Sequence, residues 1–137
     1  MSGYTVGACI STAGMLDVGF LAARTAPGQV RTLVELRLAS WGLAVLRDDV
    51  TLIASELVTN AVQHAPSERE IRVRFTREAR GVLLEVWDSC DGMPVRKHDT
   101  EGLSGRGLPI VEMLAAECGA YRTEPHGKWV WARCRLT

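Results

Sequence analysis

Apolar residues recur at helical spacing in two stretches of the N-terminal half of the chain. The first lies between Pro27 and Gly42 and predicts a helix that ends at that glycine. The second opens with the acidic pair Asp48 and Asp49, which suits the first turn of a helix. This second helix should end near His64, because a residue that precedes a proline disfavours the helical conformation and Pro66 follows shortly after.

The pattern changes to strict alternation after Ser67. Apolar residues alternate with polar ones over 71–76 and again over 82–86, which predicts an antiparallel hairpin with its turn at 78–81. A glycine-rich loop should follow over 88–107, and a third helix over 108–117. Three further strands are expected: a short edge strand within 17–25, and a final pair over 120–123 and 128–135.

This order of elements predicts one α+β domain rather than two. Three helices should pack on one face of a largely antiparallel sheet of four to five strands, forming a two-layer sandwich. The first sixteen residues are small, glycine-rich and without periodicity, so we expect a loose tail over 1–16 and a single domain over 17–137.

Composition and charge narrow the classes of function. Sixteen basic and sixteen acidic side chains cancel, so the chain lacks the positive surface that non-specific nucleic-acid binding needs. No apolar run is long enough to span a bilayer, and the N-terminus lacks the features of a signal peptide. The four cysteines form no CxxC pair, which indicates reduced thiols. We therefore expect a cytoplasmic protein that binds neither nucleic acid nor a membrane.

Three polar residues on the second helix are the first candidates for chemistry. Glu56, Asn60 and His64 are spaced four residues apart, so each is rotated only about 40° from the last and all three share one stripe. A carboxylate and an amide one turn apart can hold a hydrated Mg²⁺, and Glu56 could instead accept a proton from an attacking hydroxyl. The alternative is a solvent-facing polar stripe on an amphipathic helix.

Two further segments carry candidate ligand contacts. Asp88 stands where a strand ends and suits the exocyclic amine of a base, while Gly92 would let the backbone pass close to a flat ring. The alternative is a plain Asp/Gly turn. Gly105 and Gly107 lie where a helix begins, and without side chains they leave backbone N–H groups accessible to a phosphate. Arg106 could add a charged donor. The alternative there is an ordinary helix N-terminus.

The three segments together resemble a known family. ELVTNAVQHA on a helix, DSCDGMP after a strand and SGRGLPIVEMLA opening a helix are similar to the N box and the two glycine boxes of the GHKL ATPase superfamily. The resemblance covers roughly residues 22–136 and is best to the anti-sigma-factor serine kinases and their stand-alone actinobacterial relatives. It implies the Bergerat ATP-binding fold, with ATP and Mg²⁺ as cofactors.

The resemblance also implies a role for each matching residue. Asn60 corresponds to the asparagine that ligates Mg²⁺, and Glu56 to the acidic residue proposed as general base. Asp88 corresponds to the aspartate that binds the adenine amine, and Gly92 to the second glycine of its box. The last match, Gly105 with Gly107, corresponds to the glycines of the lid that covers the phosphates.

The chain departs from the family pattern in three places. Cys90 stands where the first glycine box has its first glycine, and the neutral Gln63 stands where a basic residue commonly precedes His64. The segment between Pro94 and Gly105 is only about ten residues long, which limits how much a lid there could enclose.

Two functions follow from these features. The first is a serine/threonine protein kinase that phosphorylates an antagonist of an anti-sigma factor and sequesters a sigma factor, which are the partners that the resemblance implies. The second is a nucleotide-gated protein-binding module without significant turnover. Glu56 favours the kinase, whereas Cys90 and Gln63 favour the binding module.

Trp129 and Trp131 lie two apart on the last strand and must share a face, either under the helices or on a surface for a homodimer or another partner.

Overall fold

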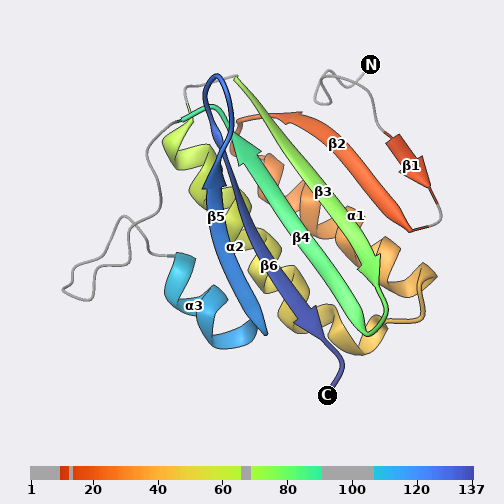
Figure 1. The fold of residues 1–137 in the computed structure, drawn as a ribbon. Helices are drawn as coiled ribbons and strands as arrows, with labels where there is room; N and C mark the ends of the chain where they lie inside the picture. The colour runs from red at the N-terminus through yellow and green to blue at the C-terminus, as the bar shows by residue number, and fades with distance from the viewer. Residues whose placement is uncertain (1–9, 13, 66–68, 91–106) are drawn as a thin grey trace.

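The fold is an antiparallel sheet with helices on one face, seen in a computed structural model that describes residues 10–12, 14–65, 69–90 and 107–137 (Figure 1). Over these residues the chain forms a six-stranded sheet in the order β1-β2-β3-β4-β6-β5, with three α-helices. The elements in chain order are β1 (Ile10–Thr12), β2 (Met15–Leu21), α1 (Ala26–Ser40), the 3-10 turn η1 (Ala44–Leu46), α2 (Arg47–His64), β3 (Glu70–Glu78), β4 (Gly81–Asp88), α3 (Gly107–Leu114), β5 (Glu117–Arg122) and β6 (Lys128–Arg135). The expected two-layer α+β sandwich is confirmed.

The sheet has more strands than the four to five expected. The additional strand is β1, and β2 begins at Met15, so both include residues that the sequence pattern assigned to the tail. The strand expected within 17–25 is also not at the edge, because β2 pairs with β1 on one side and β3 on the other. Leu16, Val18 and Phe20 of β2 alternate into the core, and pairing on both sides, with Val18 opposite Val73, places the strand inside the sheet.

The core lies between the sheet and the two long helices. The alternating apolar residues of β3 and β4 face α1 and α2, and Phe75 on β3 is completely buried. Its ring lies 5.2 Å from that of Trp41, between centroids, which ties the end of α1 to the sheet. Cys134 on β6 belongs to the same core. It is one of three described cysteines, and none of the three forms a disulfide.

The opposite face of the sheet carries the two tryptophans of β6. Trp129 and Trp131 do share a face, and it is the face away from the helices, since they alternate with the core residues Val130 and Ala132. The guanidinium of Arg74 lies 4.2 Å from the ring centroid of Trp129. Ion pairs surround these rings on the same face, including Arg72 with Asp17, Arg74 with Glu85 and Arg133 with Glu78. A partner or a second copy on this face stays a prediction.

The boundary between α3 and β5 differs from the expected one. The third helix was expected to continue to Glu117, but α3 ends at Leu114 and β5 already begins at Glu117. Pairing with β6 explains the difference, because Glu117 lies opposite Arg133 and its carboxylate accepts a 2.8 Å hydrogen bond from that guanidinium.

Among the described residues, no helix is long and apolar enough to cross a membrane.

Candidate nucleotide-binding site

The polar stripe of α2 is only partly exposed to solvent. Asn60 is buried, with 7% of its surface exposed, whereas Glu56 is half-buried and His64 is exposed. The ring of His64 is held at the end of the helix, with its Nδ1 2.9 Å from the backbone oxygen of Asn60. A simple solvent-facing stripe therefore does not describe this helix, because its central member faces the protein interior.

The buried amide of Asn60 is available to a ligand. In the described part of the chain its side chain makes no hydrogen bond, and its backbone oxygen alone contacts His64. Most buried polar side chains have a partner, and one that lacks a protein partner calls for an explanation such as a bound ion or ligand. The amide oxygen is a ligand type that Mg²⁺ accepts, so Asn60 fits the predicted role.

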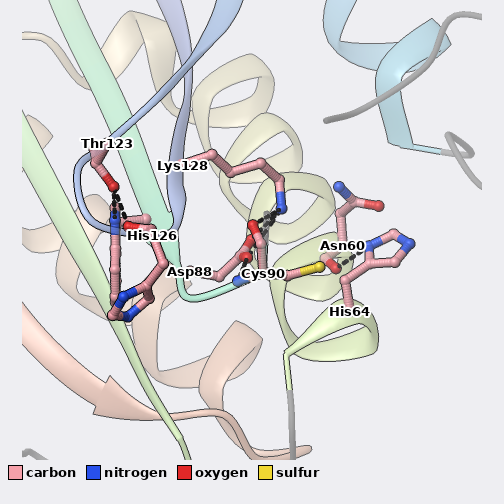
Figure 2. A network of polar contacts seen from close by, with 8 residues as sticks. Asn60, His64, Asp88, Cys90, Thr123, His126 and Lys128 are labelled. Atoms are coloured by element: carbon pink, nitrogen blue, oxygen red, sulfur yellow. Dashed lines mark hydrogen bonds and ion pairs between the residues drawn. The ribbon is translucent and has the colours of Figure 1, made fainter. Parts of the chain in front are cut away.

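Asp88 ends β4 on the helix side of the sheet and is buried, with 1% of its surface exposed. Directly opposite it in the strand register lies Lys128, the first residue of β6, which is 2% exposed. The Lys128 Nζ lies 2.9 Å from Oδ1 and 3.1 Å from Oδ2 of Asp88. Figure 2 shows this ion pair and the Asn60 side chain pointing into the same region between α2 and the ends of the two strands.

Lys128 is the residue of this site that the motif analysis missed. The sequence does contain a signal for it, because a lysine takes the position on β6 that alternation assigns to the core face, in step with Val130 and Ala132. Asp88 occupies the matching anomalous position on β4, after Val86. Two opposite charges at core-face positions of neighbouring strands predict a buried ion pair.

Cys90 has both of its backbone groups engaged by the same ion pair. Its N–H donates to Oδ1 of Asp88 at 2.8 Å, and its carbonyl accepts from the Lys128 ammonium at 3.2 Å. The residue that replaces the first glycine of the box is thus held by Asp88 and Lys128.

The phosphate end of the site is described only at its helix. Gly107 is the first residue of α3, so it lies at a helix N-terminus as the sequence predicted. The predicted contacts Gly92, Gly105 and Arg106 lie outside the described residues, as does the predicted lid.

A second polar cluster supports the ion pair from the other face of the sheet. The indole Nε1 of Trp87 donates to the Thr123 hydroxyl at 3.0 Å, and that hydroxyl donates to the backbone oxygen of His126 (Figure 2). Gly127 follows with φ of 91°, and a Cβ there would lie 2.5 Å from the Trp87 ring. The turn that leads into Lys128 is thereby packed against β4, which fixes the lysine opposite Asp88.

The described residues fit an adenine nucleotide with one condition. Among the described residues, Asn60 offers an amide that no other side chain or backbone group engages, and Oδ2 of Asp88 accepts one bond, from Lys128, so that oxygen retains a lone pair for an amine. The condition is that a base amine must reach a carboxylate whose side chain is only 2% exposed.

An antiparallel sheet with helices on one face, together with the buried polar side chains of Asn60 and Asp88, defines an α+β nucleotide-binding domain. A protein-family model described as a histidine kinase-like ATPase domain matches residues 22–134. Since the match spans most of the 137 residues, the chain belongs to the histidine kinase-like ATPase family. The GHKL resemblance is thereby confirmed, and family membership supports ATP as the ligand. A search of curated proteins finds no match.

Proposed function

We propose that this protein binds Mg-ATP and transfers the γ-phosphoryl group to a serine or threonine of a partner protein, as a regulatory kinase of the anti-sigma-factor type. One observation carries the proposal: the buried Asn60 amide makes no side-chain hydrogen bond to another described residue and lies one helical turn from the half-buried carboxylate of Glu56. A metal ligand and a proton acceptor on one face of α2 are the two groups that this chemistry needs from the helix.

Each residue has a distinct role in the proposed reaction. Asn60 would hold Mg²⁺ through its amide oxygen, and Asp88 would accept the amine of the base. When bound, ATP supplies the phosphoryl group. Glu56 would take the proton of the attacking serine or threonine hydroxyl. The hydroxyl oxygen would bond to the γ-phosphorus as the bond between that phosphorus and ADP breaks. Most of the rate enhancement would come from positioning and charge neutralisation.

The partners are proposed on the resemblance alone. They are a sigma factor, which the protein would sequester, and an antagonist of the anti-sigma factor, which it would phosphorylate. In this arrangement ATP would serve both as phosphoryl donor and as the ligand that sets the conformation of the partner-binding surface.

A second candidate function is a nucleotide-gated binding module without significant turnover. It is favoured by the Lys128 ammonium, which lies 2.9 Å from the Asp88 carboxylate. Because that carboxylate is already engaged, it binds the adenine amine less well and ATP occupies the site less. The exposed neutral Gln63 also supplies no charge for the phosphates.

Partner phosphorylation separates the two functions. Wild type and the isosteric Glu56→Gln variant are incubated with Mg-ATP radiolabelled on the γ-phosphate and with candidate anti-sigma-factor antagonists, while ATP binding is measured in parallel by calorimetry. A kinase labels the partner, and Glu56→Gln abolishes the labelling while it still binds ATP. Labelling that survives in Glu56→Gln removes this residue from the base role. ATP binding without any labelling supports the gated module instead.

A further inference from the structure

The Lys128–Asp88 pair is more deeply buried than any other ion pair among the described residues. The two side chains are each 2% exposed, whereas the pairs on the outer face of the sheet involve half-buried groups, such as Arg133 at 26% and Glu78 at 31%. Removing two charges from water is costly and is offset only when the geometry satisfies both groups. The pair is therefore a specific feature of this site.

The ammonium of Lys128 has no donor capacity left over. It carries three N–H donors and no acceptor, and three oxygens lie within reach: Oδ1 and Oδ2 of Asp88 and the carbonyl of Cys90, at 2.9, 3.1 and 3.2 Å. Lys128 consequently offers nothing to a ligand while the pair is intact. Its effect on a ligand must be exerted through Asp88.

The amine of a nucleobase and the ammonium of Lys128 are both donors, and they require the same acceptor. Oδ1 of Asp88 already accepts from Lys128 and from the Cys90 N–H, and Oδ2 accepts from Lys128. Oδ2 keeps a lone pair for a further donor, but a ligand atom cannot reach a carboxylate that is 2% exposed unless a group lying against it moves, and the Lys128 ammonium lies 2.9 and 3.1 Å from its two oxygens. Lys128 can move, because its side chain is a flexible four-carbon stem.

We propose that Lys128 is an internal competitor for the base-binding carboxylate, so that ATP must displace its ammonium from at least one oxygen of Asp88 and the residue sets ATP affinity. The inference rests on the proposed function, since it takes Asp88 as the acceptor of the base amine. The opposite role, a lysine that orients Asp88 for the base, predicts the opposite sign and is tested by the same variants.

The first test is a calorimetric comparison of ATP binding to wild type and Lys128→Met, which keeps the unbranched stem and removes the charge. We expect Lys128→Met to bind ATP about tenfold more tightly, because the base amine then forms its charge-assisted hydrogen bond to Asp88 without displacing an ammonium. Inosine triphosphate, which has an oxygen in place of the amine, should show no such gain. The double variant Asp88→Asn/Lys128→Met, without either charge, should also show none.

The outcomes separate this inference from the proposed function. Equal or weaker ATP binding by Lys128→Met, or an equal gain with inosine triphosphate, overturns the competitor role while wild-type binding upholds the proposed function. Silence from both proteins with millimolar ATP overturns the proposed function and this inference with it.

A second measurement uses the wild type and does not depend on how the variant folds. The chain has only two lysines, Lys97 and Lys128, so selective ¹⁵Nζ-lysine labelling gives two side-chain NMR signals, which Lys97→Arg assigns. We expect saturating Mg-ATP to shift the Lys128 signal, because its ammonium exchanges a carboxylate contact for a new environment. A Lys128 signal that is unchanged when the site is saturated overturns the inference.

Discussion

Replacing Asp88 by alanine should destabilise the fold strongly, quite apart from any effect on nucleotide binding. The substitution leaves the Lys128 ammonium without its counter-charge at 2% exposure. It also removes the acceptor of the Cys90 N–H bond. Breaking a buried ion pair from one side costs about 3–5 kcal/mol.

The cost can be converted into a melting temperature. An unfolding entropy of about 2.1 cal/mol/K per residue over 137 residues gives roughly 0.29 kcal/mol/K. We therefore expect the melting temperature of Asp88→Ala to fall by roughly 10–17 °C. Urea unfolding followed by tryptophan fluorescence and far-UV circular dichroism measures the same loss as a free energy of unfolding.

The neutral double variant is the matched control for this prediction. Asp88→Asn/Lys128→Met removes both charges together, and replacing a buried pair by uncharged groups of similar volume is often close to neutral. Its free energy of unfolding should lie within about 2 kcal/mol of wild type. A loss below about 1 kcal/mol in Asp88→Ala would be the behaviour of a surface pair and would contradict a large cost for breaking the Asp88–Lys128 pair.

The remaining predictions concern backbone space and a buried thiol. Gly127→Ala should lower the free energy of unfolding by at least about 2 kcal/mol, because its φ is 91° and the new Cβ would lie 2.5 Å from the Trp87 ring; Gly28→Ala, whose Cβ would meet only a flexible side chain at 3.7 Å, should be neutral or stabilising by up to about 1 kcal/mol. Equal urea midpoints for the two variants would contradict this. Burial, with a smaller contribution from a nearby acidic charge, raises the pKa of Cys134 from 9.0 to about 11. The unfolded chain therefore loses this proton first, and stability falls as pH rises from 9.0 to about 11. In urea titrations Cys134→Val should lose less stability than wild type over that interval, and a parallel loss in both proteins would exclude the thiol as the cause.

Much of the fold was predictable because its strands are buried on one face only. Alternation placed β3, β4 and β6 correctly, and the residues that alternate into the core, such as Phe75 and Val86, are buried. The helix stripe of Glu56 and Asn60 was predictable for the same reason, since periodicity survives wherever one face contacts the core.

The parts that were not predictable depend on contacts between distant residues. β1, with three residues, is too short to carry an apolar pattern of its own and becomes a strand through pairing with β2. Ala115 and Ala116 favour helix by propensity, yet the backbone N–H of Ala116 donates to the carbonyl of Arg133 on β6. Tertiary pairing outweighs local preference at both places.

The site was predictable where a motif names the residue and not where the partner lies outside it. Asp88 and Asn60 belong to short motifs, whereas Lys128 lies 40 residues from Asp88 along the chain in a segment without a motif. Only the strand register brings the two charges together. A search for charges at core-face positions would have found both.

Calorimetric titration of Mg-ATP into the wild type and Asn60→Ala tests whether the protein binds ATP through Asn60. Asn60 suits this test better than Asp88, because no described protein group relies on its side chain, so its loss leaves no buried partner unsatisfied. We predict saturable binding by wild type, binding at least about tenfold weaker by Asn60→Ala, and unchanged binding by Gln63→Ala, a variant of an exposed neighbour. Absence of heat from wild type at millimolar Mg-ATP, or equal affinity of wild type and Asn60→Ala, would contradict it.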